Sequence, residues 1–291
     1  MHTSPECLEC LRRQARYAAS LTGKDLKGQN DILAQVDAYL AGIDLKLSPP
    51  ENAVPIYRLI AQQSKCSDPF ALLKKQSNTF AAALRNDLAA QIKNSPQPLL
   101  TAIRYAIAGN VIDYGSQHRF DIKQTIDQCL NQDFAINDFE LFKKDLAQAE
   151  NILYLGDNCG EMIFDSLLIE LLKQKITLAL KESPIINDAT LADGMAYGLN
   201  RYCHLISNGS DCPGTSLADC SEDFNDLFAK AELIISKGQG NFETLSESSR
   251  PIYFLLTVKC RVVAQQLRVK TGHHIPLGGM VLLRQKKGAD R

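Results

Sequence analysis

The chain has 291 residues, of which 45% are hydrophobic and 22% charged, so it can bury a sizeable core and corresponds to about two domains. Its 32 basic and 33 acidic residues leave a net charge of −1, whereas a nucleic-acid-binding protein normally carries a basic excess. No apolar run approaches the roughly 18 residues that cross a bilayer. Nine cysteines without an export signal indicate reduced thiols. We therefore expect a cytoplasmic protein with neither a nucleic-acid nor a membrane partner.

The first half of the chain has the periodicity of helices. Apolar residues recur every three to four positions, and prolines at 49, 50 and 96 interrupt the pattern. No strong strand candidate precedes residue 149. The spacing predicts helices over 5–21, 28–42, 51–63, 69–93, 97–112 and 122–131.

The second half alternates short apolar runs with helical segments, which is typical of a parallel sheet with helices on its faces. Helices are expected over about 160–173, 190–199, 222–231 and 259–268. Met280–Leu283 is a candidate sixth strand. The fold class predicted is therefore α/β, with a Rossmann-like sheet in residues 150–291 and an all-helical region in 1–149. The five expected strands are Ile152–Leu155, Ile176–Leu180, Leu205–Ser207, Leu233–Ser236 and Ile252–Thr257.

Polar residues follow four of these apolar runs, at the sheet edge where parallel folds bind ligands. Asp157, Asn158 and Asp188 offer hard oxygen atoms, which suit Mg²⁺ or Mn²⁺ better than zinc. Lys237 stands in a glycine-flanked turn and is suited to hold a phosphoryl oxygen, as are the free N–H groups of the helix that begins near Gly160. We predict a metal site at Asp157, Asn158 and Asp188, catalytic roles for Asp157, Asp188 and Lys237, and substrate contacts from Ser210, Lys237 and Gly238.

Structural roles for the same residues stay open. Asp157 or Asn158 could cap the helix that starts near Gly160, with Glu161 completing a capping box. Asp188 or Thr190 could likewise begin the next helix. A glycine-rich loop after the first strand is also compatible with an S-adenosylmethionine-dependent methyltransferase, and a catalytically silent metabolite-binding protein is a further alternative.

The helical half contributes one polar cluster, in the segment Ala-Gly-Asn-Val-Ile-Asp-Tyr-Gly. Asn110 and Asp113 lie three residues apart, so a helix would present both on the same side. Either they are ordinary surface residues at a helix end, or this end closes over the sheet edge and contacts substrate.

Several ordered motifs together resemble the damage-control phosphatases. They are Cys-Leu-Glu-Cys from Cys7, the Asn110 segment, Gly-Asp-Asn-Cys-Gly-Glu from Gly156, Pro-Ile-Ile-Asn-Asp-Ala-Thr from Pro184, Ser-Asn-Gly-Ser-Asp from Ser207, and Ser-Lys-Gly-Gln-Gly-Asn-Phe-Glu from Ser236. The resemblance covers nearly the whole chain.

The resemblance implies a helical region that caps a Rossmann-like domain, and hydrolysis of phosphate monoesters such as sugar phosphates or damaged phosphometabolites. It implies that Asp157, Asn158 and Asp188 hold a divalent metal, with Co²⁺ or Ni²⁺ as candidates beside Mg²⁺ and Mn²⁺. It also implies that Lys237 contacts the substrate phosphate, and that Asn110 and Asp113 line the pocket. Whether the nucleophile is a water molecule or a carboxylate stays open.

Overall fold

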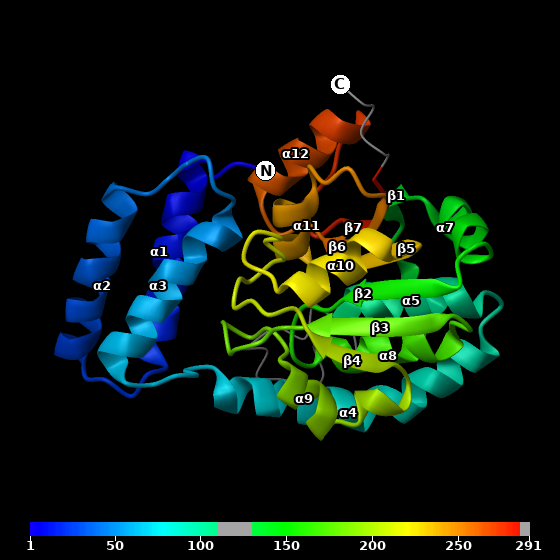
Figure 1. Ribbon diagram of the computed structural model, residues 1–291, viewed down its shortest axis with the longest axis horizontal. Helices are drawn as coiled ribbons and strands as arrows, with labels where there is room; N and C mark the ends of the chain where they lie inside the picture. Colours follow the sequence, from blue (N-terminus) through cyan, green and yellow to red (C-terminus); the bar gives the residue numbers. More distant parts are fainter. Residues whose placement is uncertain (110–129, 286–291) are drawn as a thin grey trace.

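The computed structural model describes residues 1–109 and 130–285, and Figure 1 shows a helical bundle beside a sheet that is covered by helices. The helices predicted before residue 109 are confirmed, whereas the helix predicted over 122–131 falls almost entirely outside the described residues. The first five helices are α1 (Pro5–Ser20), α2 (Leu26–Ala41), α3 (Pro49–Ser64), α4 (Ala71–Asn94) and α5 (Pro98–Ala108).

Helices α1, α2 and α3 form a bundle with its own core. Their apolar stripes meet because the buried residues recur at helical spacing. The start of α3 is fixed by Ser48 and Glu51, whose side chains form a capping box just before and after two prolines. The core of the bundle includes Leu11, Ala15, Val36, Ile56 and Ile60.

Helices α4 and α5 leave the bundle and pack against the sheet layer, where both contact α8 (Glu161–Leu171). Buried residues of α5 such as Ile103 share a core with Phe164 of α8 and with the sheet. The helices α1 to α3 therefore have a core of their own, while α4 and α5 share the core of the sheet, and the domain boundary near residue 149 stays a prediction.

The second half forms a seven-stranded sheet with the order β1-β7-β6-β5-β2-β3-β4. The strands β2 to β6 are parallel, and β7 runs antiparallel beside β6. All six strands predicted from the sequence are present. Their bounds are β2 (Asn151–Leu155), β3 (Lys175–Leu180), β4 (His204–Ser207), β5 (Leu233–Lys237), β6 (Ile252–Thr257) and β7 (Met280–Arg284).

The prediction that no strand precedes residue 149 was wrong. Residues Phe134–Asn137 form β1, an edge strand that pairs in parallel with β7. The strand has only four residues, of which Ile136 alone is buried, so it is too short to show an alternating pattern. Two short helices, α7 (Phe139–Leu146) and α11 (Gln239–Leu245), were also not predicted.

Helices cover both faces of the sheet, as predicted for this fold class. One core joins the sheet to α4, α5 and α8, and the other joins its opposite face to α10 (Glu222–Lys230), α11 and α12 (Arg261–Thr271). The short helix α9 (Leu191–Ala196) and the 3₁₀ turn η2 (Leu199–Arg201) lie beside the edge strand β4. No helix within the described residues is long and apolar enough to cross a membrane.

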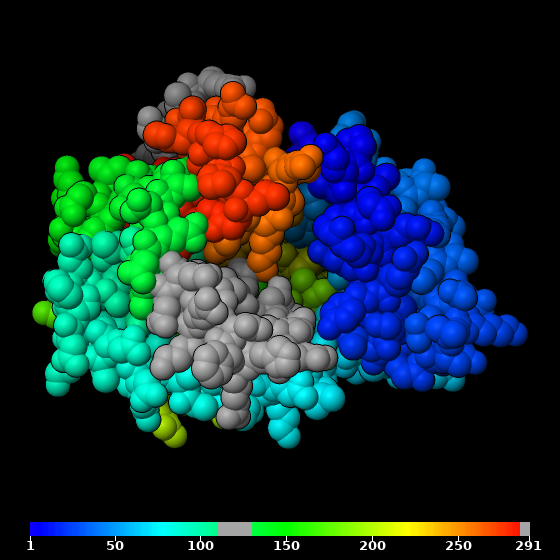
Figure 2. All heavy atoms as spheres, turned by 180° about the vertical axis from the view of Figure 1, so that it is seen from behind, coloured from blue at the N-terminus to red at the C-terminus, as the bar shows by residue number. Residues whose placement is uncertain are grey.

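Several contacts attach the bundle to the sheet layer, among them the hydrogen bond that the Ser216 hydroxyl donates to Glu51 of α3 at 3.1 Å. The amino group of Met1 donates to the carbonyl of Glu243 in α11 at 2.7 Å, and Arg58 of α3 makes two hydrogen bonds to Asp211, at 2.8 and 2.7 Å. Seen from behind, the molecule is hollowed between the bundle and the sheet layer, with yellow-green atoms of the latter visible inside (Figure 2). The hollow is therefore walled by both parts of the chain.

Glu243 at this junction makes stability depend on pH. Burial raises the pKa of its carboxyl from 4.5 to about 7, although the hydrogen bond from Gln239 opposes the shift. Because the folded protein retains this proton to higher pH than the unfolded chain, the carboxyl lowers the free energy of unfolding as pH rises from about 4.5 through 7.

Glu243→Gln is therefore expected to stabilise the protein by up to about 3 kcal/mol at pH 8 and to have little effect at pH 4. Thermal melts at both pH values measure this difference. The control is Glu247→Gln, which changes an exposed carboxylate near the same amino group. An equal effect of Glu243→Gln at both pH values would contradict the prediction.

Candidate active site

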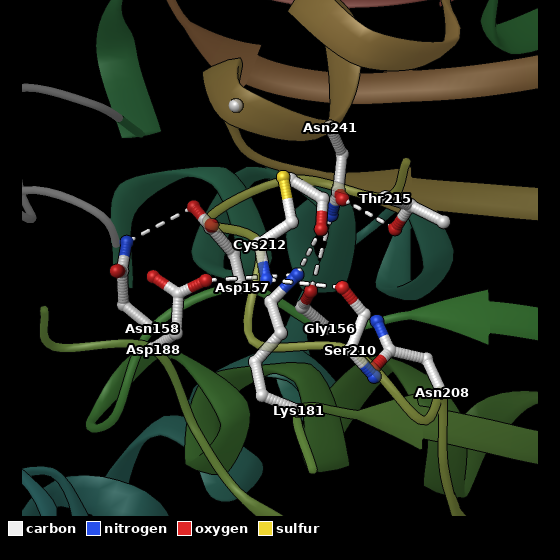
Figure 3. A network of polar contacts seen from close by, with 12 residues as sticks. Gly156, Asp157, Asn158, Lys181, Asp188, Asn208, Ser210, Cys212, Thr215 and Asn241 are labelled. Carbon is white, nitrogen blue, oxygen red and sulfur yellow. Dashed lines mark hydrogen bonds and ion pairs between the residues drawn. The ribbon is translucent and has the colours of Figure 1, made fainter. Parts of the chain in front are cut away.

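Two loops at the carboxyl ends of the neighbouring strands β2 and β3 are joined by backbone hydrogen bonds. The N–H of Cys159 donates to the carbonyl of Asn187, and the N–H of Ala189 donates to that of Asp157, both at 2.8 Å. The pairing places Asn158 opposite Asp188. The three residues predicted to hold a metal are thus brought together, as Figure 3 shows.

The side chains of these three residues form a polar group at the sheet edge. The amide nitrogen of Asn158 donates to Asp157 Oδ2 at 2.9 Å and to Glu161 Oε2 at 3.3 Å. Asp188 Oδ2 lies 3.6 Å from the ammonium of Lys181 and has no hydrogen-bond partner among the described residues. Both aspartates are buried.

The environment of this site disfavours negative charge on both aspartates. Burial raises the pKa of Asp157 well above its ordinary value, and the charges of Glu161 and Asp188 raise it further. Burial also raises the pKa of Asp188 to about 6, while the charge of Lys181 limits the increase. A bound cation would favour the charged form of both carboxylates and so offset this cost.

Lys237, which was predicted to hold the substrate phosphate, directs its ammonium toward α5 and α8, and its predicted role stays a prediction. It is fully buried, and its ammonium donates to Glu161 Oε1, to Asp165 Oδ1 at 2.7 Å and to the carbonyl of Ala106 at 2.7 Å. An ammonium has three donors, and all three are used. The physical reason is strand alternation, which turns Lys237 toward α5 and α8 instead of toward the edge.

A lysine that the structure places beside the predicted metal ligands, and that was not predicted from the sequence, is Lys181. It directly follows β3, and its ammonium lies between Asp188 and the carbonyl of Gly214, to which it donates (Figure 3). Its position immediately after a predicted strand was a usable signal. A lysine there lies at the same edge as the polar residues that follow β2.

The backbone of Gly238 lies very close to the carboxylate of Asp157. Its φ is +80°, and a Cβ at this position would lie 1.8 Å from Asp157 Oδ2. Next to it, Asn241 ties three loops together, because its amide donates to the carbonyls of Gly156 and Lys237 while its oxygen accepts from Thr215. Gly238 therefore makes room for the Asp157 carboxylate, and whether it also contacts substrate stays a prediction.

Ser210 belongs to the loop that follows β4. Its hydroxyl accepts a hydrogen bond from the N–H of Cys212 at 3.1 Å, and its carbonyl accepts one from Glu182. These contacts shape the turn beside Lys181 (Figure 3). The predicted contact between Ser210 and substrate stays a prediction, as do the roles of Asn110 and Asp113, which lie outside the described residues.

The capping alternatives are also resolved. Gly160 occupies the N-cap position of α8 with φ +78° and no side-chain cap, so neither Asp157 nor Asn158 caps this helix. Thr190, together with Asp193, forms the capping box of α9, which leaves Asp188 without a capping role. The N–H of Gly160 donates to the side chain of Asn78, so this particular donor is not available to a phosphate.

Comparisons with known proteins agree on one family. The family described as "Damage-control phosphatase ARMT1-like domain" matches residues 3–275. The chain is 34% identical to the damage-control phosphatase PH1575 of Pyrococcus horikoshii, over 98% of this chain and 99% of that protein. A damage-control phosphatase of Archaeoglobus fulgidus is 32% identical, over 94% and 97%. The chain belongs to the damage-control phosphatase family.

The fold agrees with this assignment. A crystal structure of a DUF89 family protein from Pyrococcus horikoshii superimposes with a TM-score of 0.88 at 34% identity, covering 98% of this chain and all of that one. The resemblance inferred from the motifs is thus confirmed. The relatives from Pyrococcus horikoshii and Archaeoglobus fulgidus are both named as phosphatases.

The residues of this family member suit Mg²⁺ or Mn²⁺ better than Zn²⁺. Within residues 1–109 and 130–285, no three His, Cys, Asp or Glu side chains form a metal-binding group. The candidate set instead combines two carboxylates with one carboxamide, all oxygen donors, of which Asp188 Oδ2 is buried and without a hydrogen bond. Mg²⁺ and Mn²⁺ favour such sets and keep positions for water and phosphate.

Proposed function

We propose that this damage-control phosphatase is a metal-dependent phosphatase that hydrolyses phosphate monoesters, such as sugar phosphates or damaged phosphometabolites. The observation that carries the proposal is the convergence of Asp157, Asn158 and Asp188 from two adjacent strand ends, with two buried carboxylates whose pKa is raised. Two carboxylates that ionise unfavourably on their own are suited to a cation, which would favour their charged form.

Asp157, Asn158 and Asp188 would hold the ion, with Mg²⁺ or Mn²⁺ as first candidates and Co²⁺ or Ni²⁺ as others. When bound, a divalent ion supplies positive charge to the phosphoryl oxygens and activates the nucleophile. The backbone bonds between the two loops keep the three side chains at fixed separations. Such preorganisation limits the reorganisation needed during the reaction.

Lys181 is the proposed second positive group. Among residues 1–109 and 130–285, its ammonium makes one hydrogen bond, to Gly214, and one ion pair, to Asp188, which leaves one of its three donors for a phosphoryl oxygen. The charge would hold the substrate phosphate beside the ion. In this proposal, Lys181 takes the place that the sequence analysis gave to Lys237.

Metal removal tests the proposal. Protein stripped with EDTA is expected to hydrolyse p-nitrophenyl phosphate only after Mg²⁺, Mn²⁺, Co²⁺ or Ni²⁺ is restored, because the ion supplies several kcal/mol of charge stabilisation. Release of p-nitrophenol measures the rate, and a panel of sugar phosphates then defines the substrate. Equal activity before and after stripping would contradict metal dependence.

Inactivity with every metal and every phosphate monoester would favour a catalytically silent metabolite-binding protein. Binding of S-adenosylmethionine by the same preparation would instead favour the methyltransferase alternative. The family assignment favours the phosphatase over both.

A further inference from the structure

A cluster of buried ion pairs adjoins the candidate metal site, because Glu161 belongs to the cluster and also accepts a hydrogen bond from Asn158. Lys237, Glu161 and Asp165 have side chains that are 0%, 1% and 0% exposed. Burial lowers the pKa of Lys237, but the charges of Asp165 and Glu161 more than offset this effect and keep it above its ordinary value. Buried charges of this kind are costly, so their retention calls for a functional explanation.

Several hydrogen bonds hold the ammonium of Lys237 in place. Besides Glu161, the ammonium of Lys237 contacts Asp165 Oδ1 and the carbonyl of Ala106. Asp165 Oδ1 also accepts a hydrogen bond from the hydroxyl of Tyr154 at 2.8 Å. Groups from β2, β5, α5 and α8 therefore fix the ammonium, and the ammonium fixes one oxygen of Glu161.

The other oxygen of Glu161 points to the metal site. Glu161 Oε1 accepts from Lys237, whereas Oε2 accepts from the amide nitrogen of Asn158. The same nitrogen donates to Asp157 Oδ2. Both N–H bonds of the Asn158 carboxamide thus face carboxylates, and a half-turn of the amide would bring its oxygen against two negative charges.

We propose that Glu161 is a positioning residue, held by Lys237, that orients Asn158 so that its carboxamide oxygen faces the metal ion. The inference rests on the proposed metal site and assigns a role there to the Lys237 cluster. Groups that hydrogen-bond to metal ligands fix their orientation, and losing one typically weakens metal binding about 10- to 100-fold.

The variant Glu161→Gln tests this role with almost no change in shape. The oxygen of the new amide must face the Lys237 ammonium, so its NH₂ group faces the NH₂ group of Asn158. Two donors cannot bond to one another, and Asn158 loses its fixed orientation. We expect Mn²⁺ to bind about 10- to 100-fold more weakly, as measured without substrate from the electron paramagnetic resonance signal of free Mn²⁺.

A double-mutant cycle separates positioning from direct ligation. If Glu161 acts through Asn158, the variant Asn158→Ala combined with Glu161→Gln should bind Mn²⁺ as Asn158→Ala alone does. The control is Glu170→Gln, also on α8, whose side chain is exposed and pairs with Arg85; it should bind Mn²⁺ as the unaltered protein does.

Unchanged Mn²⁺ affinity in Glu161→Gln would overturn the inference, and so would losses that multiply in the double variant. If the unaltered protein bound no Mn²⁺, the proposed metal site would fail as well, which distinguishes the two failures. Thermal melts show whether each variant is folded. Should Glu161→Gln not fold, Lys237→Arg keeps the charge but changes the three-point contact, and it is expected to weaken Mn²⁺ binding in the same way.

Discussion

Asp157→Asn is expected to abolish the proposed phosphatase activity and, at the same time, to raise the Tm of the metal-free protein. Burial raises the pKa of Asp157, and the nearby charges of Glu161 and Asp188 raise it further. Removing this carboxylate relieves repulsion among like charges, which is worth a few degrees in Tm for a protein of this size. Removing a metal ligand should lower kcat/KM at least about a thousandfold.

Two measurements check this prediction. Hydrolysis of p-nitrophenyl phosphate with added Mn²⁺ gives the activity, and melts with and without Mn²⁺ give the stability. Mn²⁺ should raise the Tm of the unaltered protein, because a bound ligand stabilises the folded state. It should not raise the Tm of Asp157→Asn, because this variant lacks one of the proposed metal ligands. Asp226→Asn on the exposed face of α10 serves as the control and should change neither quantity. Near-normal activity of Asp157→Asn would contradict the metal assignment.

Gly238→Ala is expected to lower kcat/KM about a hundredfold or more. The added Cβ would lie 1.8 Å from Oδ2 and 2.3 Å from Cγ of Asp157, so the carboxylate would have to leave its place. Displacement of a reacting or metal-binding group by about 1 Å costs roughly this factor. The backbone at φ +80° adds strain of roughly 1–2 kcal/mol for any residue with a Cβ.

Gly272→Ala provides a matched control for the strain alone. Gly272 ends α12 with φ +79°, and no atom lies within 4 Å of a Cβ built there. Gly272→Ala should lose stability in urea unfolding through strain alone, and Gly238→Ala should lose more because of the clash with Asp157, but only Gly238→Ala should lose activity. Equal activity in the two variants would show that Asp157 tolerates the added methyl group.

The three candidate metal ligands could be located from the sequence alone. It is enough that the two apolar runs that precede them form adjacent parallel strands. Residues that follow such strands reach the same edge wherever the helices pack. Asp157, Asn158 and Asp188 therefore meet in the structure as expected. Lys181, which directly follows β3, lies at the same edge for the same reason.

The place of Lys237 depended on tertiary structure. Within β5, Lys237 shares a face with Leu233 and Ile235, which belong to the core that includes α5 and α8. A strand pattern shows that alternate residues share a face, but not which helices cover that face. Only the packing of α8 brings two buried carboxylates within reach of the ammonium.

A signal for this cluster was nevertheless present in the sequence. Glu161 and Asp165 lie four residues apart in a largely apolar helix, so they occupy one side of it and require a buried partner. The sequence by itself determined which residues end the strands and which charges need partners. The tertiary structure decided which charges meet, because burial and distance, which set the strength of an ion pair, arise only when helices and sheet pack together.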